Sequence, residues 1–163
     1  MAGVGRTRVV VAAMVAVAGI GVADAQRGGF RTTPDEVQWP APARGGVGTS
    51  GVSGTQTVML KGDPAKPGLY TMLLRVGPNT HIDPHRHPDD RVATVISGTW
   101  YFGYGDRFDE GSLKRLPVGS VYEESPNVNH FAATRDEGVV IQITGYGPSG
   151  TGYVDPAKDP ARR

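Results

Sequence analysis

Short runs of β-branched and aromatic residues recur from Thr55 onward, and Gly, Pro, Asn or Asp separates each run from the next. Such runs predict β-strands, because turn-forming residues end them before a helical period can develop. No stretch of twelve residues has a helical pattern, and residues 105–117 have room for one helical turn at most. Six or more short strands in about 100 residues favour an all-β fold, an antiparallel sandwich or barrel. The runs are TQTVMLKG, GLYTMLLRVG, RVATVISGTWYFGYG, LPVGSVYEES, NHFAAT and GVVIQITGYG.

The segments on either side of this strand-rich region have a different composition. Residues 26–54 are rich in Gly, Pro and Arg, have no regular period, and predict a mostly extended N-terminal arm. Within the arm, residues 37–39 are expected to dock on a surface of the protein or on a neighbouring subunit. Residues 151–163 contain two Asp-Pro steps and predict a loose C-terminal tail. Residues 55–150 are therefore the expected barrel domain.

Residues 1–25 predict a secretory signal peptide. Two arginines lie in the first eight residues, the 15 residues from Val9 to Ala23 are apolar or small, and the sequence ADA ends at Ala25 like a cleavage site. A membrane anchor is the alternative, but the run is shorter than the roughly 20 residues that span a bilayer. We therefore expect a periplasmic or secreted protein that keeps no membrane attachment after cleavage.

The charge of the remaining chain argues against two classes of partner. The sequence has 17 basic and 16 acidic residues, and loss of Arg6, Arg8 and Asp24 with the signal peptide leaves 15 of each. A nearly neutral chain without a basic block does not favour nucleic acid or an anionic membrane surface as a partner. Because the sequence has no cysteine, a metal site would have to use His and carboxylates.

Three of the four histidines are candidates for a shared site. His85 and His87 have the spacing that places both side chains on one face of a β-strand, and His130 begins another expected strand. Imidazole nitrogens that converge in this way can bind a divalent ion at about 2.0–2.2 Å. A polar strand face without a metal is the alternative for the His-x-His pair alone.

The spacing around these histidines resembles the two sequence motifs of the cupins. The first cupin motif is Gly, five residues, His-x-His, three or four residues, Glu, six residues and Gly. The second is Gly, five residues, Pro-x-Gly, two residues, His, three residues and Asn. At the same intervals, this chain has Asn79, His85-x-His87, Arg91 and Gly98 for the first motif, and Gly119, Ser125-x-Asn127, His130 and Thr134 for the second.

The resemblance covers about residues 58–146 and implies a six-to-eight-stranded antiparallel double-stranded β-helix, the cupin or jelly-roll barrel. It also implies that the three histidines point inward as metal ligands. Asn79 and Asn127 replace motif glycines, which is a mild change because Asn tolerates the left-handed backbone conformation.

Arg91 is the most important departure, because it stands where the family has its glutamate metal ligand. Arginine has no lone pair to offer and keeps its positive charge. The interval to Gly98 has the family length, so the register is not misread, although Asp89 or Asp90 could still turn inward.

Three interpretations of this site follow. In the first, His85, His87 and His130 bind a divalent ion such as Zn, Mn, Fe, Ni or Cu. Water or a neighbouring aspartate completes its coordination, and Arg91 turns outward or pairs with an aspartate. In the second, the ion is bound and Arg91 fixes an anionic group of the substrate beside it. In the third, no metal binds, and Arg91 and the histidines hold an anion in a non-catalytic binding protein. A degenerate barrel with purely structural histidines is the remaining alternative.

Other side chains are candidates for ligand contacts. Asp90, Tyr101 and Tyr122 are candidate ligand-binding residues besides the arginine, and the tyrosines would suit a small, partly apolar ligand. Core packing is the alternative for each tyrosine. Only one of the adjacent Glu123 and Glu124 can face inward, where it could serve as a general base or a late metal ligand. Edge or surface positions are expected for both.

His81 shares the strand parity of His85 and is expected at the rim of the site. Asp83 between them is a candidate to orient a histidine ring, as carboxylates near metal ligands often do.

The sequence therefore predicts an exported protein that binds a divalent metal through three histidines together with a small, possibly anionic, organic ligand. Its second half also resembles small exported single-domain cupins. The cupins include oxygenases, isomerases, decarboxylases and plain binding proteins, so the resemblance leaves open whether the chain is an enzyme. In an enzyme, the metal would polarise a substrate oxygen or activate water or dioxygen. The resemblance also implies a possible homodimer, in which the region of Trp39 crosses to the partner subunit.

Overall fold

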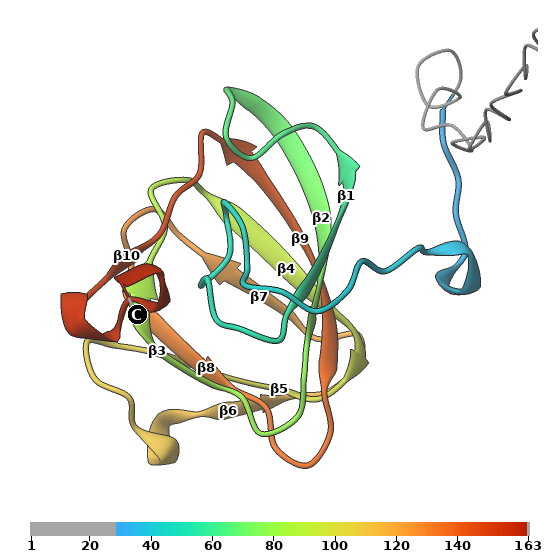
Figure 1. Ribbon diagram of the computed structural model, residues 1–163. Helices are drawn as coiled ribbons and strands as arrows, with labels where there is room; N and C mark the ends of the chain where they lie inside the picture. The colour runs from blue at the N-terminus through green and yellow to red at the C-terminus, as the bar shows by residue number, and fades with distance from the viewer. Residues whose placement is uncertain (1–28, 163) are drawn as a thin grey trace, which may run out of the picture. The chain divides into compact units, whose positions relative to one another are not determined.

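The barrel consists of two antiparallel β-sheets of five strands each (Figure 1). The computed structural model describes residues 29–162, and both sheets belong to the compact unit that begins at Val37. The strand orders are β1-β2-β9-β4-β7 and β10-β3-β8-β5-β6. The strands are β1 Gln56–Lys61, β2 Gly68–Val76, β3 His81–Arg86, β4 Arg91–Gly98, β5 Trp100–Tyr104, β6 Lys114–Leu116, β7 Val121–Glu124, β8 His130–Ala133, β9 Val139–Gly147 and β10 Gly152–Tyr153.

This architecture confirms the predicted all-β, antiparallel fold. The described residues contain ten strands, whereas six to eight were expected, because the short strands β6 and β10 extend the second sheet. Strand β10 also lies beyond residue 150, the expected end of the barrel, and pairs with β3 at His85 and Arg86. The C-terminal segment therefore contributes to the sheet that carries the histidines.

Helical structure in residues 29–162 is limited to single 3-10 turns. One of them, η3, lies within residues 105–117, where room for one turn was predicted. No helical segment in this described part of the chain has the length and apolar character needed to cross a membrane. The predicted signal peptide, residues 1–25, lies outside the described residues. The turns are η2 Pro34–Glu36, η3 Glu110–Ser112, η4 Pro156–Lys158 and η5 Pro160–Arg162.

The hydrophobic core is built by alternating residues of the long strands. Strands β2 and β9 pair along their whole length, so that Met72 lies opposite Ile143 and Leu74 opposite Ile141, all four buried. Every second side chain points inward because strand side chains alternate between the two faces of a sheet. Aromatic rings from β5 and β7 complete the apolar filling, which borders a cluster of buried polar side chains.

Two asparagines form the turns that precede the histidine-bearing strands. Asn79 and Asn127 have φ angles of 52° and 60°, which confirms the expectation that they replace glycines in the left-handed conformation. The turn at Asn127 also reaches the other motif, because its backbone N–H donates to the carbonyl of His87 at 2.7 Å. The backbone of one motif thus holds the backbone of the other.

The part of the arm from Val37 onward is attached to the barrel. Ala43 forms a β-bridge with Thr55, and the Arg75 guanidinium of β2 lies 3.9 Å from the centre of the Trp39 ring. Trp39 therefore docks on a strand of its own chain, which is the first of the two predicted alternatives, a surface of the protein or a neighbouring subunit. Its crossing to a neighbouring subunit stays a prediction.

Residues 46–51 of the arm form turns, in a segment that was expected to be mostly extended. The Thr49 side chain accepts from the N–H of Gly51 and donates to the carbonyl of Gly46. Thr49 and Ser50 are buried. We call residues 46–51 the arm turn; its role at the site is described below.

Candidate metal centre

His85, His87 and His130 come together inside the barrel, as the spacing predicted. His85 of β3 lies directly opposite His130, the first residue of β8, in the antiparallel ladder. His87 follows two residues after His85, and the exposed Arg86 between them points outward. All three histidines are buried, and their candidate ligand nitrogens lie within 4.8 Å of one another.

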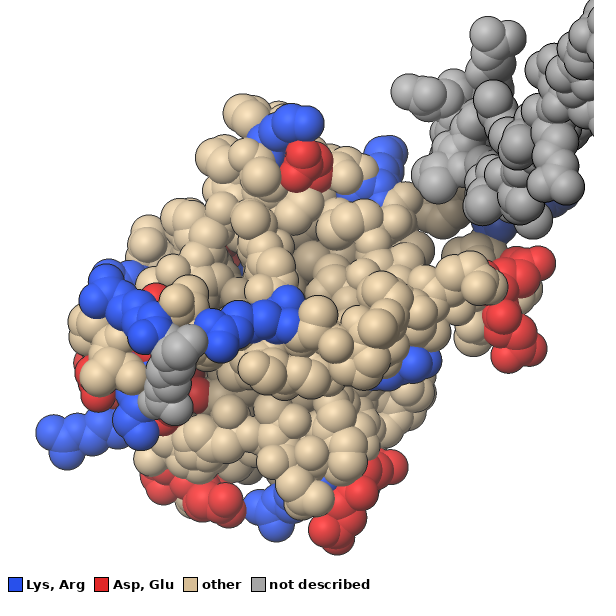
Figure 2. Space-filling view, in the orientation of Figure 1, with Lys and Arg blue, Asp and Glu red and all other residues tan. Residues whose placement is uncertain are grey.

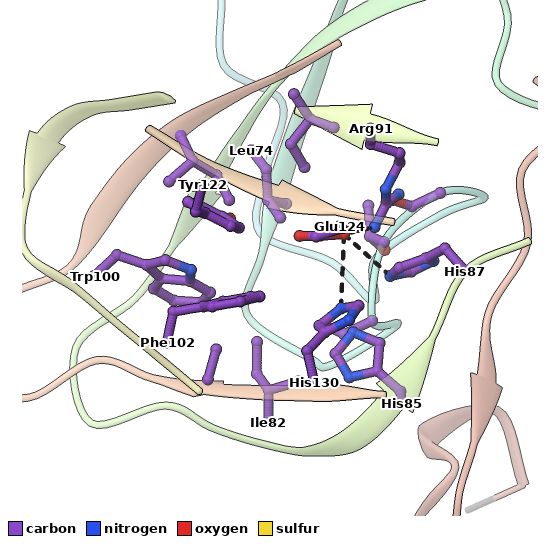
Figure 3. Close-up of a pocket in the computed structure, with 16 residues that line it drawn as sticks. Leu74, Ile82, His85, His87, Arg91, Trp100, Phe102, Tyr122, Glu124 and His130 are labelled. Carbon is purple, nitrogen blue, oxygen red and sulfur yellow. Dashed lines mark hydrogen bonds and ion pairs between the residues drawn. The ribbon is translucent and has the colours of Figure 1, made fainter. Parts of the chain in front are cut away.

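Backbone carbonyls set the tautomer of each ring. The Nδ1 atoms of His85, His87 and His130 lie 2.9, 2.5 and 3.0 Å from the carbonyl oxygens of Asp83, Gly150 and Val128. A carbonyl can only accept a hydrogen bond, so each Nδ1 carries the proton and each neutral ring keeps its lone pair on Nε2. The side chains therefore present three Nε2 atoms as ligands toward the interior (Figure 3).

Burial keeps these rings neutral. It lowers the pKa of His85 to about 3 and that of His87 to about 2, and it also lowers the pKa of His130. The positive charge of Arg91 adds to this lowering on all three rings, whereas the Glu124 carboxylate opposes it and does not outweigh burial. Neutral imidazole is the form that binds a metal, so no proton has to leave these nitrogens near neutral pH.

Arg91 points inward and pairs with Glu124. The two residues lie opposite each other in the β4–β7 ladder, both are buried, and Arg91 Nη2 donates to Glu124 Oε2. Burial alone would lower the pKa of Arg91, but the charges and hydrogen bonds of Glu124 and Tyr70 together outweigh burial and raise it. The first interpretation allowed an outward arginine or a pair with an aspartate; neither describes this structure.

Glu124 is a site residue that the sequence reasoning placed wrongly. An edge or surface position was expected, but Glu124 Oε2 lies 3.7 Å from His87 Nε2 and 3.6 Å from His130 Nε2 (Figure 3). Burial raises its pKa, but the charge and hydrogen bond of Arg91, together with His130 and His87, outweigh burial and lower the pKa to about 2, so the carboxylate is ionised. The available signal was strand parity, because Glu124 shares the inward face of β7 with the buried Tyr122.

The two aspartates beside Arg91 lie away from the histidines. Asp89 is buried, as its parity with His87 predicts, but it accepts hydrogen bonds of 2.6 Å from Tyr70 Oη and Ser149 Oγ. Asp90 is exposed. Its assignment as a ligand contact stays a prediction, which this position does not favour.

The two candidate tyrosines differ in position. Tyr122 lines the cavity beside the histidines. Tyr101 lies outside this lining, with the Arg135 guanidinium 4.5 Å from its ring centre. Their roles in ligand binding remain predictions, and the structure brings only Tyr122 to the site.

His81 is exposed and belongs to the outside of the barrel. The ladder between β3 and β8 shifts register between Ile82 and His85, so the strand parity that His81 shares with His85 is lost there. The Asp83 carboxylate lies 3.2 Å from His81 Nε2, while the Asp83 carbonyl orients His85. Asp83 thus acts on a ligand ring through its backbone.

The three histidines form the polar end of a cavity of about 30 Å³. Its other end is apolar (Figure 3), and it carries two buried donors, Trp100 Nε1 and Tyr122 Oη, that make no hydrogen bond. A volume of this size holds about two water-sized groups. The apolar lining comes from Leu74, Ile82, Phe102, Ala132, Ile141 and Ile143.

The arm turn covers this cavity. Gly48, Thr49 and Ser50 belong to its lining, and their carbonyl oxygens accept hydrogen bonds from the barrel. The donors are Arg91 Nη1 at 2.5 Å, and Thr151 Oγ1 and Tyr153 Oη at 2.6 Å each. The arm is therefore a part of the site, which its composition did not predict.

Comparisons with known proteins agree with this geometry. A family model described as the ChrR cupin-like domain matches residues 32–144. The H2HPP isomerase of Bacillus subtilis is 32% identical over 72 residues, which are 44% of this chain and 29% of that enzyme, so the match spans less than a third of it.

Solved structures show the same fold at low sequence identity. KdgF from Halomonas sp. has a TM-score of 0.52 and 19% identity, with 74% of this chain and 96% of that chain covered. The DMSP lyase DddQ from Ruegeria pomeroyi has a TM-score of 0.53 and 16% identity, with 71% and 60% covered.

Proposed function

We propose, from the premise that this chain belongs to the family of ChrR cupin-like domains within the cupin superfamily, that it binds a divalent metal ion together with a small organic molecule. His85, His87 and His130 are the ligands of the ion. One observation carries the proposal: all three Nδ1 atoms face backbone carbonyls, so three Nε2 lone pairs are buried close together. His130 Nε2 has no hydrogen-bond partner, and buried polar atoms without a partner are costly unless something binds them.

The donor set limits the identity of the ion. Imidazole nitrogen suits Zn, Fe, Ni or Cu, whereas Ca²⁺ and Mg²⁺ prefer shells made of oxygen atoms, and Mn²⁺ needs oxygen ligands beside the histidines. When bound, such an ion polarises an oxygen of the organic molecule or activates a water molecule. The carbonyls of Asp83, Gly150 and Val128 would keep the three rings aimed at it.

The apolar half of the cavity supports a very small organic molecule, or one end of a larger one, as the second ligand, because the cavity has room for about two water-sized groups. Trp100 Nε1 and Tyr122 Oη are buried donors without partners, and they suit a hydrogen-bond acceptor on a small, partly apolar molecule. Metal-assisted chemistry on that molecule is the proposed activity, and the local match to the H2HPP isomerase is consistent with an enzyme.

The charges at the site favour this proposal over a metal-free anion pocket. The Arg91 charge is compensated by Glu124, and the three histidines are neutral, so the cluster as a whole carries no excess positive charge. The face shown in Figure 2 carries scattered charges of both signs and no continuous basic patch among its described residues. This face therefore does not favour nucleic acid as a partner.

Export is part of the proposal and rests on the features of residues 1–25. The protein would work in the periplasm or outside the cell, without a membrane attachment, and a homodimer is its proposed assembly. Mass spectrometry of the protein recovered from the periplasm or medium tests export, since cleavage after Ala25 leaves a chain that begins at Gln26. Recovery of the full-length chain from the cytoplasm alone would contradict it.

Metal analysis tests the central claim. Protein purified without a His tag and loaded with each of the five ions should retain about one equivalent of at least one of them. The double variant His85→Ala, His130→Ala should retain none, while His81→Ala, which changes an exposed histidine, should bind like the wild type. Failure of the wild type to retain any of these ions would overturn the proposal.

A further inference from the structure

We infer that Glu124 is the fourth protein ligand of the metal ion and that Arg91 is the positioning residue that holds its carboxylate. This inference rests on the proposed metal site and adds to it an oxygen ligand from β7. It also assigns a role to the arginine that stands in the position of the usual glutamate. In the cupin motif a glutamate stands at the position of Arg91. In this chain the arginine has that position, and the glutamate lies directly opposite it in the β4–β7 ladder.

Two of the distances from the Glu124 carboxylate, those to His87 and His130, are close to the separations in a coordination shell. Four ligands at about 2.1 Å from a tetrahedral ion lie about 3.4 Å from one another. Glu124 Oε2 lies 3.7 and 3.6 Å from the Nε2 atoms of His87 and His130. A contraction of a few tenths of an ångström therefore brings the carboxylate oxygen and the two nitrogens to the separation that an ion requires.

The same contacts are too long to be hydrogen bonds, which need about 3.2 Å or less between nitrogen and oxygen. The protons of His87 and His130 are on Nδ1, so an imidazole lone pair faces a carboxylate oxygen in both contacts. Two lone pairs directed at each other repel, and in a buried site this repulsion is not screened by water. A cation between them converts the repulsion into attraction.

Arg91 restrains the carboxylate without blocking it. Its Nη2 donates to Glu124 Oε2, and a carboxylate oxygen has a second lone pair that stays available to the ion. Its Nη1 is held by the carbonyl of Gly48 in the arm turn. Arginine therefore restrains the carboxylate from the neighbouring strand β4, at the same end of the cavity as His87 (Figure 3).

The affinity for Zn²⁺, measured by competition with a chelator, tests the assignment. Glu124→Gln keeps the shape of the side chain but removes its charge, and it should weaken binding at least about 100-fold. The matched control Glu123→Gln changes the exposed neighbour and should bind within about threefold of the wild type. If Glu124→Gln does not fold, Glu124→Asp replaces it, with weakened binding expected.

Infrared difference spectra between Zn²⁺-loaded and metal-free protein detect coordination directly, because a carboxylate that only supports the fold would not change its band when the metal binds. A carboxylate band should shift on metal binding in the wild type and in Glu123→Gln but not in Glu124→Gln. The exchange variant Arg91→Glu, Glu124→Arg should recover binding to within about tenfold of the wild type, because it returns the carboxylate to the opposite strand. Glu124→Arg alone should bind no metal.

The failures of the two proposals can be told apart. Wild-type affinity in Glu124→Gln, together with loss of metal in His85→Ala, His130→Ala, would overturn the assignment of Glu124 and leave the three-histidine site in place. A wild-type protein that binds no metal would overturn both.

Discussion

The backbone N–H of Asn127 donates a 2.7 Å hydrogen bond to the carbonyl of His87, and it does so from a left-handed conformation with φ 60°. Asn127→Ala should destabilise the protein by about 1 kcal/mol, because alanine is less stable than asparagine in this conformation. Asn127→Gly should remain within a few tenths of a kcal/mol of the wild type or exceed its stability. Urea denaturation of the metal-free proteins checks the order; equal stability of the Ala and Gly variants would contradict it.

The metal-free protein should lose stability in acid. The pKa values of His85 and His87 fall from 6.5 to about 3 and about 2 on folding, so the unfolded chain binds more protons than the folded one below about pH 6.5. The free energy of unfolding is then highest above pH 6.5 and falls as the pH decreases toward 3, by up to about 1.4 kcal/mol per pH unit for each histidine.

Urea denaturation in the presence of a chelator, at several values between pH 7 and pH 4, measures this slope. His85→Gln should show a shallower slope than the wild type, because it removes one of the buried rings. A free energy of unfolding that stays constant over this range would show that the buried histidines have the same pKa in the folded and unfolded protein.

The arm turn should limit how fast the metal leaves. Tyr153→Phe removes the hydrogen bond to the carbonyl of Ser50 and keeps the ring that stacks on His85. A lost hydrogen bond of about 1 kcal/mol raises the population of the open turn about fivefold, so a chelator should remove Zn²⁺ about fivefold faster. Tyr104→Phe, which also removes a tyrosine-to-carbonyl hydrogen bond but on an exposed side chain, is the matched control. Equal release rates in the two variants would show that the turn does not cover the exit.

A small anion should bind to the loaded centre. The imidazoles are neutral and Arg91 compensates Glu124, so a divalent ion keeps two positive charges in a buried cavity of about 30 Å³. Azide should bind to the Cu²⁺-loaded protein and produce a charge-transfer band that saturates. With both proteins saturated with Cu²⁺, Arg91→Met should weaken azide binding at least about tenfold, because it removes one positive charge. Equal azide affinity would contradict this charge count.

Local spacing was enough to establish much of the site. The alternation of strand side chains placed His85, His87, Asp89 and Arg91 on one face, and all four are buried. The turn chemistry of Asn79 and Asn127 was also predictable, because few residue types besides glycine tolerate the left-handed conformation that these positions need. Both features depend on residues that are close in sequence.

The remaining features depend on contacts between distant segments. The β4–β7 register pairs Arg91 with Glu124, 33 residues later, and the arm turn reaches Arg91 from 43 residues earlier. The register shift between Ile82 and His85 removes His81 from the inner face. Periodicity specifies which face a side chain takes within one strand, whereas the partner strand and its register arise only when the sheets close around the core. That closure decides that the carboxylate at this site is Glu124.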